Sequence, residues 1–448
     1  MTKKLFGTSG IRGDAKSLFT KEFCFDIGRT FVEFLKRKNS LSPIAIGMDP
    51  RESSSRIKSD LFLGLKTAGV ELFDEGVVPI PSINWLIINT LIKSAIMVTG
   101  SHLAPNLNGV KFYAHNEEIS YDDQVEIEKI YYEIKDDKNA INVNINPFME
   151  DRAKELYTNL LLNTAVKEYP SWRVAVDCAN GGQSVVIPKV LKSLGLDIIE
   201  LNCDIESNFI ARDTDTDDKA VIKDLEALVV KEKCDFGIAF DGDGDRVVFI
   251  DEKGQFVQGE YSCSIMANNL EIDSIVTPIS SSQVVDRLGK NVFRTKVGSP
   301  YVIAKMKEVS AMFGFEPNGG AIFADTMYTR DGGSMAIKML NLFKKYNSKF
   351  SEMIATLPKY YMFRTKVEYK WELKDTIINK AKTEFKGTKT EEMDGLKIWL
   401  DDSTWILFRS SVNAPEFRVF AESSDETKAK DLLSRGMNLV NKVLEENQ

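Results

Sequence analysis

A serine at the end of an apolar run is the first feature of this sequence that could carry chemistry. Residues 95–98 are typical of a buried strand, and they lead within a few positions to Ser101 and His102. Turn-forming residues follow, so we expect a loop that brings Lys111 back near the serine. A strand-end serine with an imidazole and an amine nearby predicts a nucleophile or a phosphate carrier. The alternative for this stretch alone is an ordinary surface loop.

Three aspartates alternate with glycines near the middle of the chain. Asp241, Asp243 and Asp245 would repel one another on one tight loop unless a cation neutralised them, and oxygen ligands select Mg²⁺ or Ca²⁺. One alternative is an acidic turn between strands. Another is an EF-hand calcium loop with Glu252 at its twelfth position. We reject the EF-hand because Arg246 stands where that loop requires glycine, and because the flanking runs are strand-like rather than helical.

A third polar cluster lies near the end of the chain, where a loop between two strands is expected. A guanidinium grouped with hydroxyl, amide and backbone donors can cradle an anion. The alternative is a polar hairpin without a ligand. The side chains of this cluster are Arg409, Ser410, Ser411 and Asn413, with Arg418 beyond them.

Composition limits the classes of function. A chain of 448 residues with 43% apolar residues suggests roughly three globular domains, and the net charge of -8 argues against nonspecific nucleic-acid binding. The most apolar stretch, residues 83–98, is interrupted by polar side chains, so it does not predict a membrane span. The five cysteines show no CxxC spacing, which favours free thiols in a reducing compartment. The first residues show no apolar signal core after their lysines. We therefore expect a cytoplasmic protein that binds neither nucleic acid nor membrane.

Repeated patterns of hydrophobic residues predict the elements that position these clusters. Residues 43–78 read as strand, turn, helix and strand, residues 172–203 repeat the pattern, and a weaker copy begins at Ser274. Such units predict three related α/β domains with mixed sheets, whose strand ends hold the polar loops. From about residue 362 the strands are short and lack parallel crossovers. This predicts a C-terminal α+β domain with an antiparallel sheet.

Five stretches in this order and spacing resemble the α-D-phosphohexomutase family, which includes phosphoglucomutase, phosphomannomutase and phosphoglucosamine mutase. The resemblance covers nearly the whole chain. The stretches are residues 6–13, 98–112, 241–246, 314–320 and 409–418.

The resemblance implies roles for the reactive loops. Ser101 would carry a phosphoryl group, with His102 and Lys111 beside it, and Lys111 is the likelier proton shuttle because nearby cations and metal can lower a lysine pKa. Arg12 and Arg246 would supply further positive charge to the transferring group. The three aspartates of the middle loop, Asp241, Asp243 and Asp245, would bind Mg²⁺, and the phosphorylated serine would add another oxygen.

The resemblance also implies a substrate site. Glu316 and Asn318 would bind sugar hydroxyls, with Lys296 and Ser299 on the neighbouring loop as weaker candidates. The Arg409 cluster, comprising Arg409, Ser410, Ser411, Asn413 and Arg418, would bind the phosphate that does not react.

The chain departs from the common family pattern at several positions. Leu103 and Ala104 replace an asparagine and a proline that often follow the serine and histidine. In the sugar loop, Asn318 replaces a serine and Gly320 a histidine, so a sugar preference does not carry over from the family.

The predicted domains and function follow from the resemblance. The domains are residues 1–150 with the phosphoserine loop, 151–256 with the metal loop, 257–360 with the sugar loop, and 361–448 with the phosphate-binding loop.

The expected enzyme interconverts hexose 1-phosphate and hexose 6-phosphate through a hexose 1,6-bisphosphate, which also serves as activator. Phosphoglucomutase/phosphomannomutase activity is the first expectation. Phosphoglucosamine mutase and a catalytically silent sugar-phosphate sensor are the alternatives, and an aspartate-dependent hydrolase lacks a second supporting motif. The partner is a phosphosugar, and the protein is expected to be a monomer or homodimer.

Overall fold

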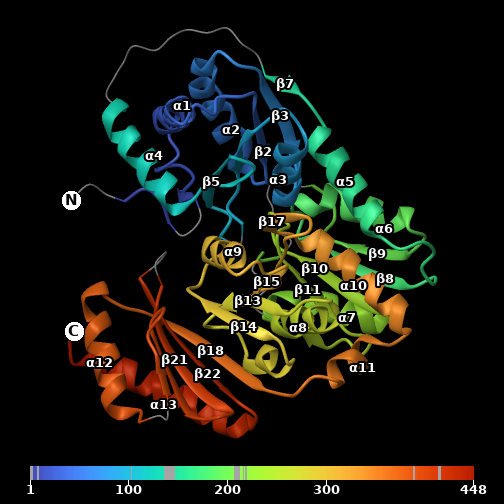
Figure 1. Cartoon of the computed structure of the whole chain (residues 1–448), viewed down its shortest axis with the longest axis vertical. Helices are drawn as coiled ribbons and strands as arrows, with labels where there is room; N and C mark the ends of the chain where they lie inside the picture. Colours follow the sequence, from blue (N-terminus) through green and yellow to red (C-terminus); the bar gives the residue numbers. More distant parts are fainter. Residues whose placement is uncertain are drawn as a thin grey trace.

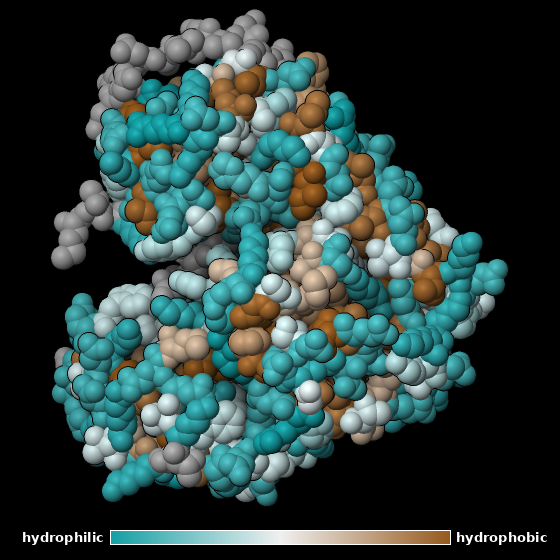
Figure 2. Space-filling model, in the orientation of Figure 1, coloured by the Kyte–Doolittle hydropathy of each residue, from teal (hydrophilic) through white to brown (hydrophobic). Residues whose placement is uncertain are grey.

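The computed structural model describes residues 4–7, 10–101, 103–135, 147–205, 212–214, 216, 219–386, 389–411 and 415–447. Four sheets follow one another along the chain, and Figure 1 shows the first at one end of the molecule and the fourth as a separate layer beside the third. Figure 2 shows the surface hollowed between the lobes built on the first and the fourth sheets. In the described part of the chain, no helix is both long and apolar enough to cross a bilayer.

The first sheet has the strand order β1-β5-β4-β2-β3-β7, with β6 beside β5. Its strands β2, β3 and β4 are parallel, whereas β5 runs antiparallel to β4. The elements of this region are β1 (Ile11–Asp14), α1 (Lys21–Arg37), β2 (Ile44–Met48), α2 (Glu52–Leu65), β3 (Leu72–Val77), α3 (Ile80–Asn89), β4 (Ser94–Val98), β5 (Leu107–Ala114), β6 (Glu117–Glu118), α4 (Tyr121–Ile134) and β7 (Phe148–Met149).

The second sheet, β12-β11-β10-β8-β9, repeats this arrangement. Strands β8, β9 and β10 are parallel, and β11 returns antiparallel to β10. The elements are α5 (Arg152–Thr164), β8 (Arg173–Asp177), α6 (Ile187–Ser193), β9 (Asp197–Leu201), α7 (Lys223–Glu232), β10 (Phe236–Phe240), β11 (Val247–Ile250) and β12 (Phe256–Val257).

The third sheet, β14-β13-β15-β16-β17, has parallel strands β13, β14 and β15 followed by antiparallel β16. Its buried side chains form one continuous hydrophobic cluster with those of the second sheet. The elements are α8 (Gly259–Asn269), β13 (Ser274–Pro278), the 3-10 helix η4 (Gln283–Arg287), β14 (Asn291–Thr295), α9 (Ser299–Glu308), β15 (Phe313–Glu316), β16 (Gly320–Phe323), β17 (Met327–Arg330), α10 (Gly332–Tyr346) and α11 (Phe350–Ala355).

The fourth sheet, β18-β22-β21-β20-β19, is antiparallel throughout. Helices α12 and α13 pack on one face, and the other face meets Ile279 of the third sheet's region. The elements are β18 (Tyr361–Glu368), α12 (Lys374–Glu384), β19 (Lys389–Glu391), β20 (Leu396–Asp401), β21 (Thr404–Ser410), β22 (Glu416–Ser423) and α13 (Glu426–Glu445).

The predicted fold class is confirmed, and the repeat explains where the polar loops lie. In each of the first three sheets, a buried parallel strand is followed by an antiparallel one, and the predicted polar loop joins the two. These connections are β4–β5, β10–β11 and β15–β16. Gly69 and Gly195, which follow the first helical segment of the first and second repeats, have φ angles of 69° and 82°, which a residue without Cβ adopts readily.

Candidate active site

Ser101 lies just beyond the carboxyl end of β4 and is fully buried. Its φ angle of 51° is left-handed, a conformation that is uncommon outside glycine. The backbone N–H donates to Thr99 Oγ1 at 2.8 Å, and the side-chain Oγ lies 3.4 Å from Asp241 Oδ2 in the second sheet's loop. The serine hydroxyl is therefore held against the aspartate cluster, as the sequence predicts. The adjacent His102 lies outside the described residues.

Arg51 holds the backbone of the serine loop, a role that sequence analysis missed. Its guanidinium donates to four backbone carbonyl oxygens, at distances of 2.8–3.1 Å. Because backbone atoms accept these bonds, Arg51 can hold this loop whatever side chains stand at Leu103 and Ala104. The accepting carbonyls belong to Ser101, Leu103, Ala104 and Leu107.

Asp49, two residues before Arg51, also supports the serine loop. Its carboxylate pairs with Arg51 Nε at 3.0 Å and accepts hydrogen bonds from Thr99 Oγ1 and from the Gly100 N–H. Both side chains of the pair are almost completely buried. The Asp49–Arg51 segment, which the sequence indicates only as a turn, therefore builds the support for Ser101.

The three aspartates of the β10–β11 loop are buried side by side. Carboxylate oxygens of Asp241, Asp243 and Asp245 lie within 4.8 Å of one another. The Oδ1 atoms of Asp243 and Asp245 are buried and have no hydrogen-bond partner among the described residues. Converging carboxylate oxygens with unused acceptor capacity fit a hard divalent cation, whose charge would relieve their repulsion.

Backbone contacts from other elements fix this loop. The carbonyl of Gly242 accepts from the Gly182 N–H, that of Asp243 from the Ile80 N–H, and that of Gly244 from Gln183 Nε2. These bonds are 2.9–3.0 Å long. Since Ile80 begins α3, the first sheet's region helps to set the metal loop of the second. The backbone carbonyls of the loop are thereby held by hydrogen bonds, while its three carboxylates point toward one another.

The charges of the three aspartates are strongly coupled. Burial raises the pKa of Asp241 well above its usual range, and repulsion from Asp243 and Asp245 adds to the shift. Burial acts in the same direction on Asp243, but the positive charges of Lys111 and Arg330 outweigh it and hold that pKa below the usual range. Burial raises the pKa of Asp245, although Arg330 opposes the shift. Without a cation, the cluster favours carrying less than its full negative charge.

The cations predicted for phosphoryl transfer surround this cluster. Lys111 Nζ lies 3.4 Å from Asp243 Oδ2, and Arg246 Nε lies 3.6 Å from Asp241 Oδ2. Burial lowers the pKa of Arg12, and the carboxylate of Asp243 opposes that shift, which places Arg12 within electrostatic reach of the same loop. The fold thus brings together cations from distant parts of the sequence.

Arg330 connects the metal loop to the predicted sugar loop. It is buried, and its Nη2 lies 2.5 Å from Asp245 Oδ2 while its Nη1 lies 2.6 Å from Glu316 Oε2. A Cβ on Gly320 would lie 2.5 Å from Arg330 Cδ, so the glycine that replaces the family's histidine makes room for this arginine. The sequence pointed to no role for Arg330, whose neighbour Asp331 is the N-cap of α10. The arginine ends the largely buried strand β17, and a buried guanidinium requires carboxylate partners.

The other predicted sugar-site residues follow β14 and β15, whose carboxyl ends lie at the same edge of the third sheet. The Asn318 side-chain oxygen accepts from the Gly320 N–H at 3.3 Å, which stiffens the turn after β15. On the neighbouring loop, Lys296 is exposed and packs over the Tyr301 ring, whereas Ser299 is buried at the start of α9. The Glu316 carboxylate is therefore the buried anionic group of this region, and Arg330 orients it.

The phosphate cluster differs from the prediction, because Arg409 and Ser410 lie within β21 rather than in a loop. Successive strand residues point to opposite faces. Arg409 Nε pairs with Asp394 Oδ2 at 2.7 Å on one face, while Ser410 Oγ shares a hydrogen bond with Tyr369 on the other. These two residues therefore do not present their side chains to one ligand. Ser411 is buried next to them, and Asn413 lies outside the described residues.

Arg418 is the partner that the fold brings to Arg409. The two residues are directly paired across β21 and β22. Arg418 Nη2 donates to Glu416 Oε2 at 2.9 Å, so each guanidinium has its own carboxylate. Like charges directly opposite each other in a sheet are unfavourable, and an anion between them offsets this cost. Arg418 is part of the cluster read from the sequence, and strand pairing sets it directly opposite Arg409.

A mixed α/β scaffold that places a buried serine against three aspartates and several cations is that of a phosphoryl-transfer enzyme. Three domain families match the chain: phosphoglucomutase/phosphomannomutase α/β/α domain I over residues 3–138, domain II over residues 150–254 and domain III over residues 258–361. The chain belongs to the phosphoglucomutase/phosphomannomutase family.

Relatives extend over the full chain. It is 34% identical to a phosphoglucomutase/phosphomannomutase of Thermococcus kodakarensis, over 98% of this chain and 99% of that protein. It is 30% identical to a probable phosphoglucosamine mutase of Methanopyrus kandleri, over 99% of both chains. Its fold matches that of a phosphoglucomutase/phosphomannomutase family protein of Burkholderia thailandensis with a TM-score of 0.84 and 23% identity, covering 100% of this chain and 98% of the other.

Proposed function

We propose that this protein interconverts hexose 1-phosphates and hexose 6-phosphates by way of phosphorylated Ser101, with glucose and mannose phosphates as the preferred substrates. The observation that carries the proposal is the Ser101 hydroxyl, held 3.4 Å from Asp241 within a buried group of carboxylates and cations. The phosphoserine would transfer its phosphoryl group to the sugar, giving a hexose 1,6-bisphosphate. After the bisphosphate turns round, its other phosphate would return to the serine.

The residues around the serine suit this chemistry. Asp241, Asp243 and Asp245 would hold Mg²⁺, which supplies positive charge to the phosphoryl oxygens when bound. Arg246 and Arg12 would stabilise negative charge on the transferring group from other directions. We assign proton transfer at the sugar hydroxyl to the amine of Lys111, with His102 as the second candidate. A hexose 1,6-bisphosphate would serve as activator by phosphorylating Ser101.

The substrate would be held at both ends. Glu316 and Asn318 would accept and donate hydrogen bonds to the sugar hydroxyls, with Lys296 and Ser299 at the neighbouring loop. The opposite phosphate would bind Arg409 and Arg418, with support from Ser411 and Asn413. Ser410, on the other face of β21, would instead hold Tyr369. We also propose four functional domains, residues 1–150, 151–256, 257–360 and 361–448, so that each contributes one loop to the site.

A parallel assay tests this function. The phosphorylated, Mg²⁺-loaded protein would be given the 1-phosphates of glucose, mannose, glucosamine and N-acetylglucosamine, each with its matched 1,6-bisphosphate. We expect 6-phosphate products from the glucose and mannose series. Preference for the glucosamine series would instead support a phosphoglucosamine mutase, as the names of several relatives suggest. Binding without turnover of any substrate would support a sensor and contradict the proposal.

Mg²⁺ binding is expected to stabilise the fold, and Asp243→Asn is expected to weaken that effect. A ligand at 100 times its dissociation constant stabilises a protein by about 2.7 kcal/mol. If the substitution weakens Mg²⁺ binding tenfold, the gain falls by about 1.4 kcal/mol. Thermal unfolding with and without Mg²⁺ measures this difference without any assay of activity.

The exposed carboxylate of Asp325, which pairs with Lys338, provides the control. Asp325→Asn should retain the full Mg²⁺-dependent stabilisation. An equal Mg²⁺ effect in the wild-type and Asp243→Asn proteins would place the metal elsewhere.

A further inference from the structure

The third and fourth sheets are joined by polar contacts between buried groups. Lys397 Nζ, on β20, donates to the Ile279 carbonyl at 3.0 Å. The buried Glu422 carboxylate accepts from the Gln283 N–H at 2.9 Å, and Gln283 Nε2 donates to the Ser403 carbonyl. The fourth sheet is therefore fastened to the third along a continuous seam.

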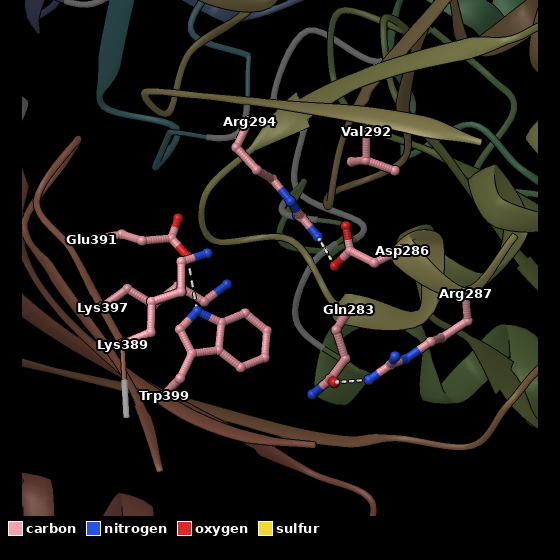
Figure 3. A pocket seen from close by; sticks show the side chains of 9 residues that line it. All are labelled: Gln283, Asp286, Arg287, Val292, Arg294, Lys389, Glu391, Lys397 and Trp399. Carbon is pink, nitrogen blue, oxygen red and sulfur yellow. Dashed lines mark hydrogen bonds and ion pairs between the residues drawn. The ribbon is translucent and has the colours of Figure 1, made fainter. Parts of the chain in front are cut away.

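Figure 3 shows a cavity of about 300 Å³ within this seam, between β14 and the β19–β20 pair. Its charged groups are engaged with one another or with backbone. Arg294 pairs with Asp286 at 2.6 Å, and Lys389 pairs with Glu391 at 2.9 Å. Because these charges are paired within the protein, the cavity is part of the interface between the third and fourth sheets. The pairs do not indicate a separate ligand in the cavity.

Asp394 lies farther along the same seam, in the turn between β19 and β20. One carboxylate oxygen, Oδ2, accepts the Val297 backbone N–H at 2.9 Å and Arg409 Nε at 2.7 Å. Val297 lies in the loop that presents Lys296 and Ser299, whereas Arg409 belongs to the phosphate cluster. A single oxygen atom thus connects the loop assigned to the sugar with Arg409 on β21, which is assigned to the distant phosphate.

The turn that carries Asp394 is itself closely fitted to Arg409. Gly395 has a φ angle of 91°, and a Cβ there would lie 2.2 Å from the Phe408 carbonyl oxygen. Only glycine allows the turn to approach β21 so closely. The position of the Asp394 carboxylate beside Arg409 is therefore determined by the backbone and not by a flexible side chain alone.

We propose that Asp394 is a positioning residue that makes the Lys296–Ser299 loop and Arg409 bind substrate as one unit. The identity of that substrate rests on the proposed function. Asp394 engages the Nε edge of Arg409, which orients the two Nη nitrogens as donors for a phosphate. The same carboxylate holds Val297, so the orientation of the phosphate anchor and the position of the sugar-facing loop are linked.

The test is direct binding of glucose 1-phosphate and glucose 6-phosphate to the full-length, Mg²⁺-loaded protein, measured by calorimetry. Asp394→Asn keeps an oxygen that can accept the Val297 N–H but loses the charge that orients Arg409. We expect both dissociation constants to rise about tenfold or more, as for the loss of a charge-assisted hydrogen bond. Both should rise together because one anchor serves both phosphates.

A double-variant comparison separates positioning from a general structural role. If Asp394 acts through Arg409, adding Asp394→Asn to Arg409→Ala should weaken binding little beyond Arg409→Ala alone. The proposal is overturned if the affinity losses of the two single variants multiply in the double variant, or if Asp394→Asn leaves the affinity unchanged.

Glu391 offers a matched control, because this seam carboxylate contacts Trp399 and Lys389 instead. Glu391→Gln should leave both sugar-phosphate affinities unchanged. A loss of affinity equal to that of Asp394→Asn would assign the effect to the seam as a whole and contradict the proposal. Binding is measured without turnover, so a wild-type protein that binds both sugar phosphates without interconverting them would refute the proposed function and still decide the role of Asp394.

Discussion

Ser101→Ala is expected to reduce mutase turnover by at least about a thousandfold, because the proposed mechanism carries the phosphoryl group on this hydroxyl. The fold should remain intact, since the alanine removes one oxygen whose contact with Asp241 is 3.4 Å long. Steady-state assays in both directions, with a 1,6-bisphosphate activator present, measure the loss. Circular dichroism and thermal unfolding should be close to those of the wild type.

Mass spectrometry supplies an independent check of the carrier. The active wild-type protein should carry phosphate on Ser101, and the alanine variant should not be phosphorylated by the bisphosphate. Ser59→Ala, on the exposed face of α2, is the matched control and should keep full turnover. Normal activity in Ser101→Ala would eliminate the covalent mechanism, even if the protein binds sugar phosphates.

Arg51→Met is expected to cause the second large effect, on both stability and turnover. It leaves the buried Asp49 carboxylate without its ion-pair partner, which typically costs about 3–5 kcal/mol. It also removes the donor to four backbone carbonyls of the serine loop. A displacement of the serine by about 1 Å can cost about a hundredfold in rate. Chemical denaturation and kcat measure the two effects separately.

Arg51→Lys keeps the protein measurable if the methionine variant does not fold. A lysine retains the charge beside Asp49 but cannot span four carbonyls with one ammonium group. We therefore expect a smaller loss of stability than in Arg51→Met, together with a reduced kcat. Arg56→Met, in the helix α2 that follows Arg51, removes donors to the Phe19 and Ala15 carbonyls and should leave kcat close to normal. A wild-type kcat in Arg51→Lys would mean that the serine loop does not depend on this guanidinium.

The local sequence was sufficient to predict the reactive loops and the elements that carry them. An apolar run ending near Ser101, and another ending at Asp241, identify buried strands because side-chain burial leaves a direct imprint on hydrophobic pattern. Glycines at helix ends, such as Gly69, and alternating aspartates and glycines are likewise short-range signals. The repeated order of these signals predicted three related α/β units and an antiparallel fourth.

Strand pairing decided what the phosphate cluster looks like. The serines after Arg409 are typical of a loop, so the sequence predicted that Arg409 and Ser410 share a ligand. Pairing with β22 extends β21 through both residues, which turns their side chains to opposite faces and sets Arg418 opposite Arg409. Such pairing depends on a partner strand and leaves no signal in the local pattern.

Only the tertiary structure identified the residues that support the site. Arg51 reaches the Ser101 carbonyl from 50 residues away, and Arg330 joins Asp245 to Glu316 across two sheets. Asp394 similarly connects the loop after β14 in the third sheet with β21 in the fourth. Of these residues, only Arg51 lies in a segment that the sequence analysis described, and there it is part of a turn. Their roles arise because buried charges and backbone carbonyls must find partners, and the folded chain alone determines which partners lie within reach.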